Sequence, residues 1–147
     1  MNTLALIVED DEDLANIFAE ALRGVGFEVE HIADGKTAQD RLKNGATPFL
    51  ILLDMHIPQI SGAELLTNVI KKEEHLAKMT VIITTADARM GENYSDMADF
   101  VMIKPISFVQ LRDLTSRLKP KDKIIMEKIV LLPDCFSPPE EIIIGVI

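Results

Sequence analysis

Five consecutive apolar residues, 49–53, run directly into the carboxylate of Asp54. A run this short and this apolar is typical of a strand buried on both faces, as in a parallel sheet covered by helices. Pro58 cannot continue a ladder of hydrogen bonds, so the strand ends before it. Asp54 then lies at a strand's C-terminal end, where open α/β sheets bind their ligands. The alternative is that Asp54 simply caps a helix or starts a turn, as Asp often does after a strand.

Four further segments have the character of strands, at residues 4–8, 27–32, 81–83 and 100–103. The segment 27–32 alternates apolar and polar residues, as a strand at the edge of a sheet does. Helical patterns separate the strands, and this strict alternation predicts an α/β fold, a doubly wound five-stranded parallel sheet with helices on both faces. Because crossovers are right-handed, few topologies remain, and we expect the flavodoxin-like order 2-1-3-4-5.

The helices are predicted from apolar spacing and from their caps. After the first strand, apolar residues recur at the spacing of one helix face: Leu14, Ile17, Phe18, Ala21 and Leu22. We expect Asp13 to be the N-cap of this helix and Gly24 to follow its C-terminus. A short helix opened by Asp34 and Gly35 should bury Ala38 and Leu42.

Ser61 and Ser107 each begin the pattern of a capping box, with Glu64 or Gln110 three residues later. The first of these helices is predicted to bury Leu65, Leu66, Val69 and Ile70, with Lys71 and Lys72 in its last turn. The second is predicted to bury Phe108, Leu111, Leu114 and Leu118. Residues 87–98 contain few periodic apolar positions, so we expect any helix there to be short or irregular.

Composition sets limits on the class of protein. The 147 residues are 48% hydrophobic and 27% charged, which is typical of one globular domain. A net charge of −9 argues against non-specific binding to DNA or to anionic membranes, and we expect no direct DNA binding. The single cysteine, Cys135, excludes an intramolecular disulfide. The sequence has no signal peptide pattern and no long apolar span, so we expect a soluble, cytoplasmic protein without membrane partners.

The C-terminal ends of parallel strands meet at one edge of a sheet, and here they carry polar groups. The residues delivered there are Glu9, Asp10, Asp54, Thr85 and Lys104. Three carboxylates close together raise one another's pKa unless a cation is present. Mg²⁺ suits such a site, because it prefers one or two carboxylates together with waters and a phosphate.

The hydroxyl and the ammonium group suit an anion with several oxygen atoms. The metal, Thr85 and Lys104 can each take one oxygen of a phosphoryl group. Asp54, at the end of the buried strand, is placed to accept that group as an acyl phosphate.

Taken together, these features resemble the receiver domain of two-component response regulators. The resemblance covers residues 4–119, about four-fifths of the chain. It rests on Ile7-Val8-Glu9-Asp10-Asp11, on Leu53-Asp54-Met55-His56-Ile57-Pro58 with Gly62, on Thr85-Ala86 and on Lys104-Pro105. Each piece is common by chance, but their order, spacing and positions at strand ends make the combination specific.

The resemblance implies that Asp54 takes phosphate from a phosphohistidine of a sensor histidine kinase or phosphotransfer protein. Asp10, Asp54 and the backbone carbonyl of His56 would ligate Mg²⁺ directly, and Glu9 would act through water. Thr85 and Lys104 would bind the phosphoryl oxygens.

The resemblance also implies an output. Phosphorylation would reshape the surface of helix 4, strand 5 and helix 5 for an unknown protein partner, and this surface or the tail could form a homodimer. The chain would be no enzyme beyond its own phosphorylation and dephosphorylation at Asp54.

The sequence departs from the family pattern in its switch region. Members often carry an aromatic residue three positions before the lysine, where this chain has Val101, and the Thr85–Lys104 interval is short. We therefore expect activation without an aromatic rotamer switch. His56 either lies over the phosphoryl group or faces solvent, and Asp87 is placed to pair with Thr85. We expect His31 and His75 to be surface residues.

We divide the chain into a receiver domain, residues 1–119, and a tail, residues 120–147, that does not match the family. The tail is rich in isoleucine and is interrupted by Pro133, Pro138 and Pro139. It is too short for an output domain. It packs on the receiver, mediates self-association, or remains from a longer or altered reading frame, and the sequence leaves these alternatives open.

Three functions remain for comparison. The first is a phospho-accepting signalling module, and the second is a pseudo-receiver that acts as an interaction scaffold without phosphate. The third is a phosphatase with an aspartate nucleophile. Such enzymes usually have a second acid two residues after the nucleophile, and this chain has His56 there. A scaffold has no need for the full set of acids with Thr85 and Lys104, so we favour the first.

Overall fold

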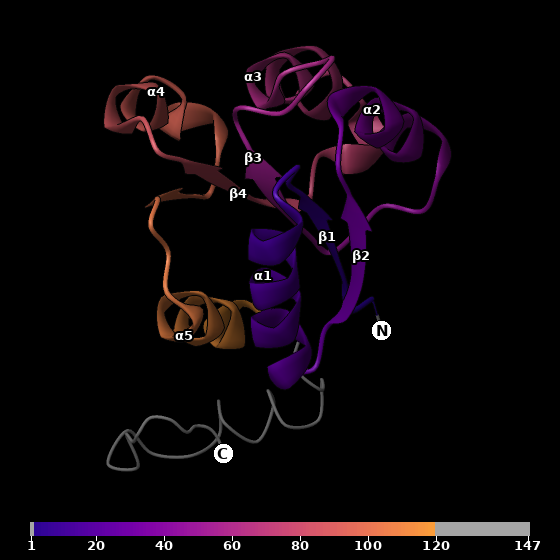
Figure 1. The fold of residues 1–147 in the computed structure, drawn as a ribbon. Coiled ribbons are helices and arrows are strands. Elements are labelled where there is room, and N and C mark those ends of the chain that lie inside the picture. The colour runs from indigo at the N-terminus through magenta and orange to yellow at the C-terminus, as the bar shows by residue number, and fades with distance from the viewer. Residues whose placement is uncertain (1, 120–147) are drawn as a thin grey trace, which may run out of the picture.

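The computed structural model describes residues 2–119. Five strands alternate with helices along the chain (Figure 1). The strands are β1 (Leu4–Val8), β2 (Glu28–Ile32), β3 (Leu50–Asp54), β4 (Thr80–Thr85) and β5 (Phe100–Ile103). The α-helices are α1 (Glu12–Gly24), α2 (Gly35–Asn44), α3 (Gly62–Leu65), α4 (Ala88–Asn93) and α5 (Phe108–Leu118). A π-helical turn, η1 (Leu66–Ile70), continues α3, and two short 3₁₀ turns are η2 (Glu74–Leu76) and η3 (Ser95–Met97).

All five strands are parallel, and their order is β2-β1-β3-β4-β5, which confirms the predicted topology. The register places Val8 of β1 opposite Leu53 of β3, and Asp54 opposite Thr84 of β4. Residues that follow β1 therefore lie beside the end of β3. The strand β2, predicted as an edge, is one edge of the sheet, and β5 is the other.

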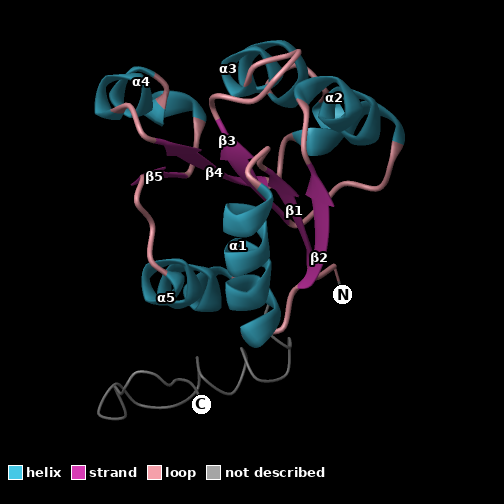
Figure 2. Cartoon of the chain, in the orientation of Figure 1, coloured by secondary structure: helices cyan, strands magenta, loops and turns pink. Residues whose placement is uncertain are grey.

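Helices cover both faces of the sheet, as predicted (Figure 2). The helices α1 and α5 pack on one face, against apolar residues that include Ile7 and Leu52. The helices α2 and α3 pack on the other face, against residues that include Leu6 and Leu53. Every residue of β3 is buried, because the strand lies in the middle of the sheet between these two layers.

The helix α1 begins two residues earlier than the predicted cap implies. Its N-cap is Asp11, whose carboxylate accepts a hydrogen bond from the N–H of Leu14, and Asp13 already lies in the first turn. At the other end, Gly24 belongs to the helix, and Gly26 takes the positive φ of 102°. The predicted buried stripe is wrong at Ile17, which is 43% exposed, because Ala15 takes a place in the core.

Both predicted capping boxes are present, at Ser61 and at Ser107. All four apolar residues predicted in the helix after Ser61 are buried, although its second half is π-helical and Lys71 lies just after it. In α5, Leu111 is buried, but Phe108 is 37% exposed. Phe108 is the first residue of the helix, and its predicted burial is wrong. The short helix α4 and the turn η3 confirm the irregular segment predicted at 87–98.

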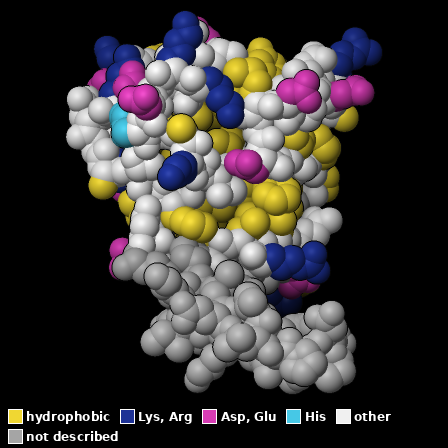
Figure 3. Space-filling view, turned by 180° about the vertical axis from the view of Figure 1, so that it is seen from behind, with side chains coloured by type: hydrophobic (Ala, Val, Ile, Leu, Met, Phe, Trp, Pro, Cys, Tyr) yellow, Lys and Arg dark blue, Asp and Glu magenta, His cyan; other side chains and the backbone are white. Residues whose placement is uncertain are grey.

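Large apolar side chains that remain exposed in the described chain are concentrated on one side. Four lie on β5 and α5, and they are Phe100, Ile103, Phe108 and Val109. Seen from behind in Figure 3, hydrophobic side chains reach the surface across the middle of the molecule, with charged side chains above and below. None of the helices that the structure describes has the length and apolar character to span a membrane. The predictions for residues 120–147, Cys135 included, lie outside the described residues.

Candidate functional site

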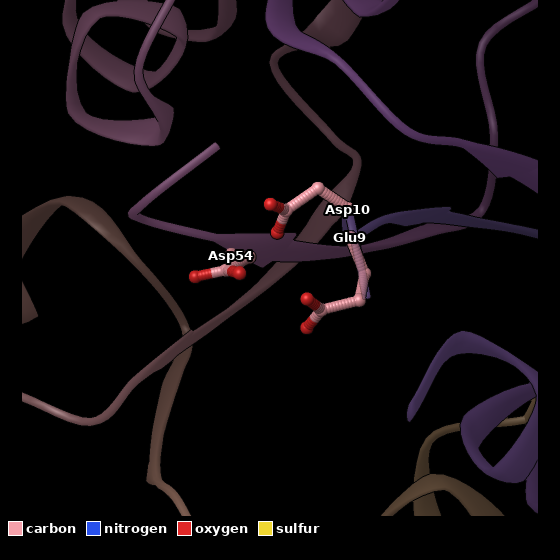
Figure 4. Close-up of side chains that lie close together, drawn as sticks. All are labelled: Glu9, Asp10 and Asp54. Carbon is pink, nitrogen blue, oxygen red and sulfur yellow. The ribbon is translucent and has the colours of Figure 1, made fainter. Parts of the chain in front are cut away.

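Three carboxylates meet at the C-terminal edge of the sheet, as the sequence predicts. Glu9 and Asp10 follow β1, and Asp54 ends β3 (Figure 4). One oxygen from each lies within 4.8 Å of the others. Glu9 and Asp54 are buried, whereas Asp10 is exposed at the mouth of the site. We call these three residues the carboxylate cluster.

Lys104 reaches the same cluster from the end of β5. Its Nζ donates hydrogen bonds to Glu9 Oε1 at 2.9 Å and to Asp54 Oδ2 at 3.2 Å. The backbone N–H of Lys104 donates to the carbonyl of Thr85 at 2.8 Å, which ties the start of the β5–α5 connection to the end of β4. The lysine therefore neutralises part of the negative charge of two carboxylates that lie almost entirely out of water.

Burial gives Glu9 an unusual ionisation. Loss of solvent, together with the nearby charge of Asp54, raises the pKa of Glu9 to about 7, although hydrogen bonds from Lys104 and Asp11 oppose this. Burial by itself lowers the pKa of Lys104, but the hydrogen bond to Glu9 and the charge of Asp54 outweigh it, so its pKa lies above the ordinary value. Lys104 is therefore a permanent cation, and Glu9 is a group that exchanges a proton near neutrality.

The loop after β3 holds Asp54 through its backbone. The N–H of His56 donates to Asp54 Oδ1 at 3.0 Å, and the N–H of Gly62 donates to the carbonyl of Met55 at 3.1 Å. A Cβ atom on Gly62 would lie 2.2 Å from the carbonyl oxygen of Asp54, so this close approach requires glycine. The side chain of His56 is exposed, which leaves its backbone as the part that shapes the site.

Thr85 is fully buried at the end of β4. Its Oγ1 accepts a hydrogen bond from the backbone N–H of Asp87 at 3.0 Å. Asp87 therefore pairs with Thr85 through its backbone, while its carboxylate caps α4 through the N–H groups of Arg89 and Met90. The described structure thus places Thr85 on the same strand edge as the cluster but gives its hydroxyl a backbone partner.

Val101, in the position where the family often has an aromatic residue, lies beneath α4. A Cβ atom on Gly91 of α4 would lie 2.9 Å from Val101 Cγ1 and 3.4 Å from Thr85 Cγ2. Gly91 on the helix and Val101 on the strand let α4 approach the sheet closely. A larger side chain that pointed from residue 101 toward Gly91 would press against α4.

Sequence reasoning missed one residue beside the cluster. His31 is exposed, as predicted, but its Nε2 lies 2.7 Å from the carbonyl oxygen of Glu9. His75, also exposed, similarly contacts the carbonyl of Leu42 at 2.8 Å. The sequence position of His31 could have indicated this contact, because His31 lies one residue before the end of a strand predicted to neighbour β1.

A family model of the response regulator receiver domain matches residues 5–116. The chain belongs to this family. The probable methanogenesis regulatory protein FilR2 of Methanothrix harundinacea is 32% identical over 79% of the chain and 81% of that protein. The phosphate regulon transcriptional regulatory protein PhoB of Rhizobium meliloti is 31% identical over 78% of the chain, but the chain spans just 53% of it.

A solved receiver structure has the same fold and a relevant ligand. The response regulator TrrA of Thermotoga maritima, in complex with Mg²⁺ and BeF, has a TM-score of 0.69 and is 26% identical, with 80% of this chain and 99% of that chain covered. The receiver domain described here offers donors that fit the same metal. They are three carboxylates with oxygens close together, two of them buried, and hard oxygen ligands are those that Mg²⁺ prefers.

Proposed function

We propose that this chain is a cytoplasmic, phospho-accepting receiver module of a two-component phosphorelay, with Asp54 as the acceptor. One observation carries the proposal: Lys104 Nζ bridges Glu9 and Asp54 within a cluster of three carboxylates. This arrangement combines an oxygen nucleophile, a fixed cation and oxygen ligands for a second cation. Phosphoryl transfer depends mainly on such positioning and charge neutralisation.

The reaction that this geometry favours is an in-line transfer. A carboxylate oxygen of Asp54 attacks the phosphorus of a phosphohistidine, a P–O bond forms, and the P–N bond breaks. The released electron pair stays on the imidazole nitrogen of the donor protein, which takes up a proton. Lys104 lies 3.2 Å from Asp54 Oδ2 and stabilises negative charge on the transferred group. The hydroxyl of Thr85 would donate a hydrogen bond to a phosphoryl oxygen, while its oxygen accepts from the N–H of Asp87.

The carboxylates of Asp10 and Asp54 and the backbone carbonyl of His56 would hold Mg²⁺, with Glu9 acting through water. When bound, the metal supplies positive charge for the phosphoryl oxygens. The chain's own part is to keep these oxygens together: β1 carries two acids, β3 carries the third, and the N–H of His56 orients Asp54. Burial, together with the charge of Asp54, raises the pKa of Glu9, and a divalent cation at the site would favour the ionised carboxylate.

The output that we propose is a change in the surface formed by α4, β5 and α5. Exposed apolar side chains already lie there, including Phe100 and Ile103, and Ile103 also lies next to Gly91 of α4. A partner protein or a second copy of the chain would bind this surface. This chain has Val101 in place of a large aromatic residue, and Gly91 of α4 packs closely against it. The change on phosphorylation would therefore pass through α4 rather than through an aromatic rotamer.

The test is phosphorylation by a small phosphodonor, acetyl phosphate, in the presence of Mg²⁺. The wild-type chain should gain one base-labile phosphoryl group by intact mass, and Asp54→Asn should gain none. Asp40→Asn, at an exposed position of α2, is the matched control and should behave as wild type. An Asp54→Asn protein that still acquires the labile group would exclude Asp54 as the acceptor.

The alternative is a pseudo-receiver that binds partners without phosphate. It predicts that neither acetyl phosphate nor beryllofluoride changes the spectrum of the protein in Mg²⁺. The buried Lys104–Glu9 and Lys104–Asp54 ion pairs favour the phospho-accepting function, because a scaffold gains little stability from buried charges.

A further inference from the structure

The loop that carries Asp10 is held at the backbone by the neighbouring strand. The N–H of Glu9 donates to the carbonyl of Ile32, at the end of β2, at 3.1 Å. In a continued parallel ladder, the carbonyl of Glu9 would next accept from the N–H of Asp34. Asp34 instead begins α2 as its N-cap, so β2 has already turned away. The ring of His31 takes the place of that donor.

The contact between His31 and Glu9 is a hydrogen bond of defined direction. A carbonyl oxygen can accept but not donate, so the Nε2 of His31, at 2.7 Å, carries the proton and donates it. The Glu9 carbonyl shares a planar peptide unit with the nitrogen of Asp10. A bond that fixes this plane therefore fixes the direction in which the chain enters Asp10.

The peptide on the other side of Asp10 is held as well. The N–H of Asp11 donates to Glu9 Oε2 at 3.1 Å. That second contact involves a carboxylate of the proposed metal site and can change when the site is loaded. The contact made by His31 is to the backbone and does not depend on the ionisation or ligation of Glu9. Asp10 is itself exposed, so its position depends on these backbone contacts rather than on packing.

We propose that His31 is a positioning residue for the divalent metal site. Its ring holds the Glu9–Asp10 peptide from the edge strand β2, beside β1 in Figure 1, and so keeps the Asp10 carboxylate within reach of Glu9 and Asp54. This inference rests on the proposed function, because it gives His31 a part in magnesium binding. The substitution of such supporting groups typically weakens metal binding by about 10- to 100-fold.

The experiment measures Mn²⁺ binding to the full chain by electron paramagnetic resonance, since Mn²⁺ prefers the same oxygen ligands as Mg²⁺. All variants are measured in the same buffer near pH 8. His31→Ala removes the hydrogen-bond donor. His31→Leu also removes the donor but keeps a bulky side chain. His31→Gln keeps an N–H donor at a similar reach. His75→Ala is the matched control, because it removes an equivalent bond to the carbonyl of Leu42.

We expect His31→Ala and His31→Leu to bind Mn²⁺ about tenfold more weakly than wild type. His31→Gln should recover most of the affinity, and His75→Ala should leave it unchanged. Thermal midpoints in EDTA should fall by similar amounts for His31→Ala and His75→Ala, which separates metal positioning from general stability. The proposal would be overturned if a folded His31→Ala or His31→Leu protein bound Mn²⁺ as tightly as wild type. It would also be overturned if His31→Gln lost as much Mn²⁺ affinity as the Ala and Leu variants.

The outcomes separate this inference from the function on which it rests. If wild type binds Mn²⁺ and is phosphorylated while the His31 variants bind equally well, the inference alone fails. If wild type binds Mn²⁺ but takes no phosphate on Asp54, the proposed acceptor fails, and the His31 comparison still decides the inference. If wild type binds no Mn²⁺, both are wrong.

Discussion

The Nζ of Lys104 lies 3.2 Å from Oδ2 of Asp54, although 50 residues separate the two in the sequence. The fold brings them together because both follow parallel strands, β5 and β3, with β4 between them. The same nitrogen also contacts Glu9, so one cation serves two buried carboxylates. Its removal leaves negative charge that solvent cannot reach.

Lys104→Met should lower the free energy of unfolding of the metal-free protein by about 1–3 kcal/mol, less than the full cost of an unpaired buried charge, because Glu9 can take up a proton. Added Mg²⁺ should stabilise the variant at least as much as wild type, since the ammonium group no longer competes for the carboxylates. Urea denaturation in EDTA and in Mg²⁺ measures both effects.

Lys71→Met is the control for this substitution, because Lys71 is exposed and lies beyond η1. It should change the stability little in either buffer. A Lys104→Met protein as stable as wild type in EDTA would contradict the assigned ion pairs.

The raised pKa of Glu9 predicts an unusual pH dependence. Its pKa is about 7 in the folded chain and 4.5 ordinarily, so between these values the folded state keeps a proton that the unfolded state has lost. The contribution of Glu9 to the free energy of unfolding is therefore complete below the lower value and declines as pH rises through the higher one. In EDTA, wild type should lose stability relative to Glu9→Gln as the pH is raised from about 5 to about 8.

Mg²⁺ should reverse this trend, because metal ligands must be deprotonated and binding therefore strengthens with pH. The thermal midpoints of wild type and Glu9→Gln are measured with and without Mg²⁺. The difference between the two proteins removes the contribution of all other titrating groups. A difference between the two proteins that is independent of pH in EDTA would show that Glu9 ionises normally.

The sequence was sufficient to predict the sheet and its polar edge. A strand that is apolar up to its last residue, such as β3, is typical of the inside of a parallel sheet, and the polar residue at its end then lies at the C-terminal edge. This reasoning placed Glu9, Asp54 and Lys104 together, and the structure confirms that they are in contact. The metal, the phosphate and the roles of the residues stay predictions.

The errors concern features that depend on neighbours in space. Asp11 and Asp13 are equally good caps by composition, and only the backbone path at Asp11 decides between them. Ile17 and Phe108 have helical spacing, but their exposure depends on how far the adjacent helices and the sheet extend. The strand that carries His31 was predicted to end at Ile32, as it does, but the contact of the His31 ring with the carbonyl of Glu9 depends on the direction of a side chain in space.

His56→Ala should leave divalent metal affinity unchanged, because the proposed ligand at this position is the backbone carbonyl and the side chain is exposed. The N–H that orients Asp54 also remains. The lifetime of the phosphorylated protein is the sensitive quantity, and it should change if the imidazole lies over the phosphoryl group. Mn²⁺ titration and decay of the phosphorylated mass species measure the two properties. A loss of affinity in His56→Ala would assign the imidazole to the metal site.

Gly91→Ala should destabilise the protein, although alanine is the better helix former by about 1 kcal/mol. The new Cβ would lie 2.9 Å from Val101 Cγ1 and 3.1 Å from Ile103 Cδ1, and overpacking of this kind costs about 1–3 kcal/mol. Gly24→Ala is the matched control. Its Cβ would meet nothing within 4 Å, so the free energy of unfolding should rise by roughly 0.5–1 kcal/mol.

Val101→Ala should relieve the clash, so the Gly91→Ala/Val101→Ala double variant should be more stable than the sum of the single changes predicts. Urea denaturation of the four proteins gives this coupling. Val101→Ala alone should keep phosphorylation-dependent partner binding, since no aromatic switch operates at this position, whereas Gly91→Ala should weaken it by displacing α4 from Thr85. If Val101→Ala abolishes that binding, residue 101 carries the switch despite its size, and the expectation of activation without a switch at this position is wrong.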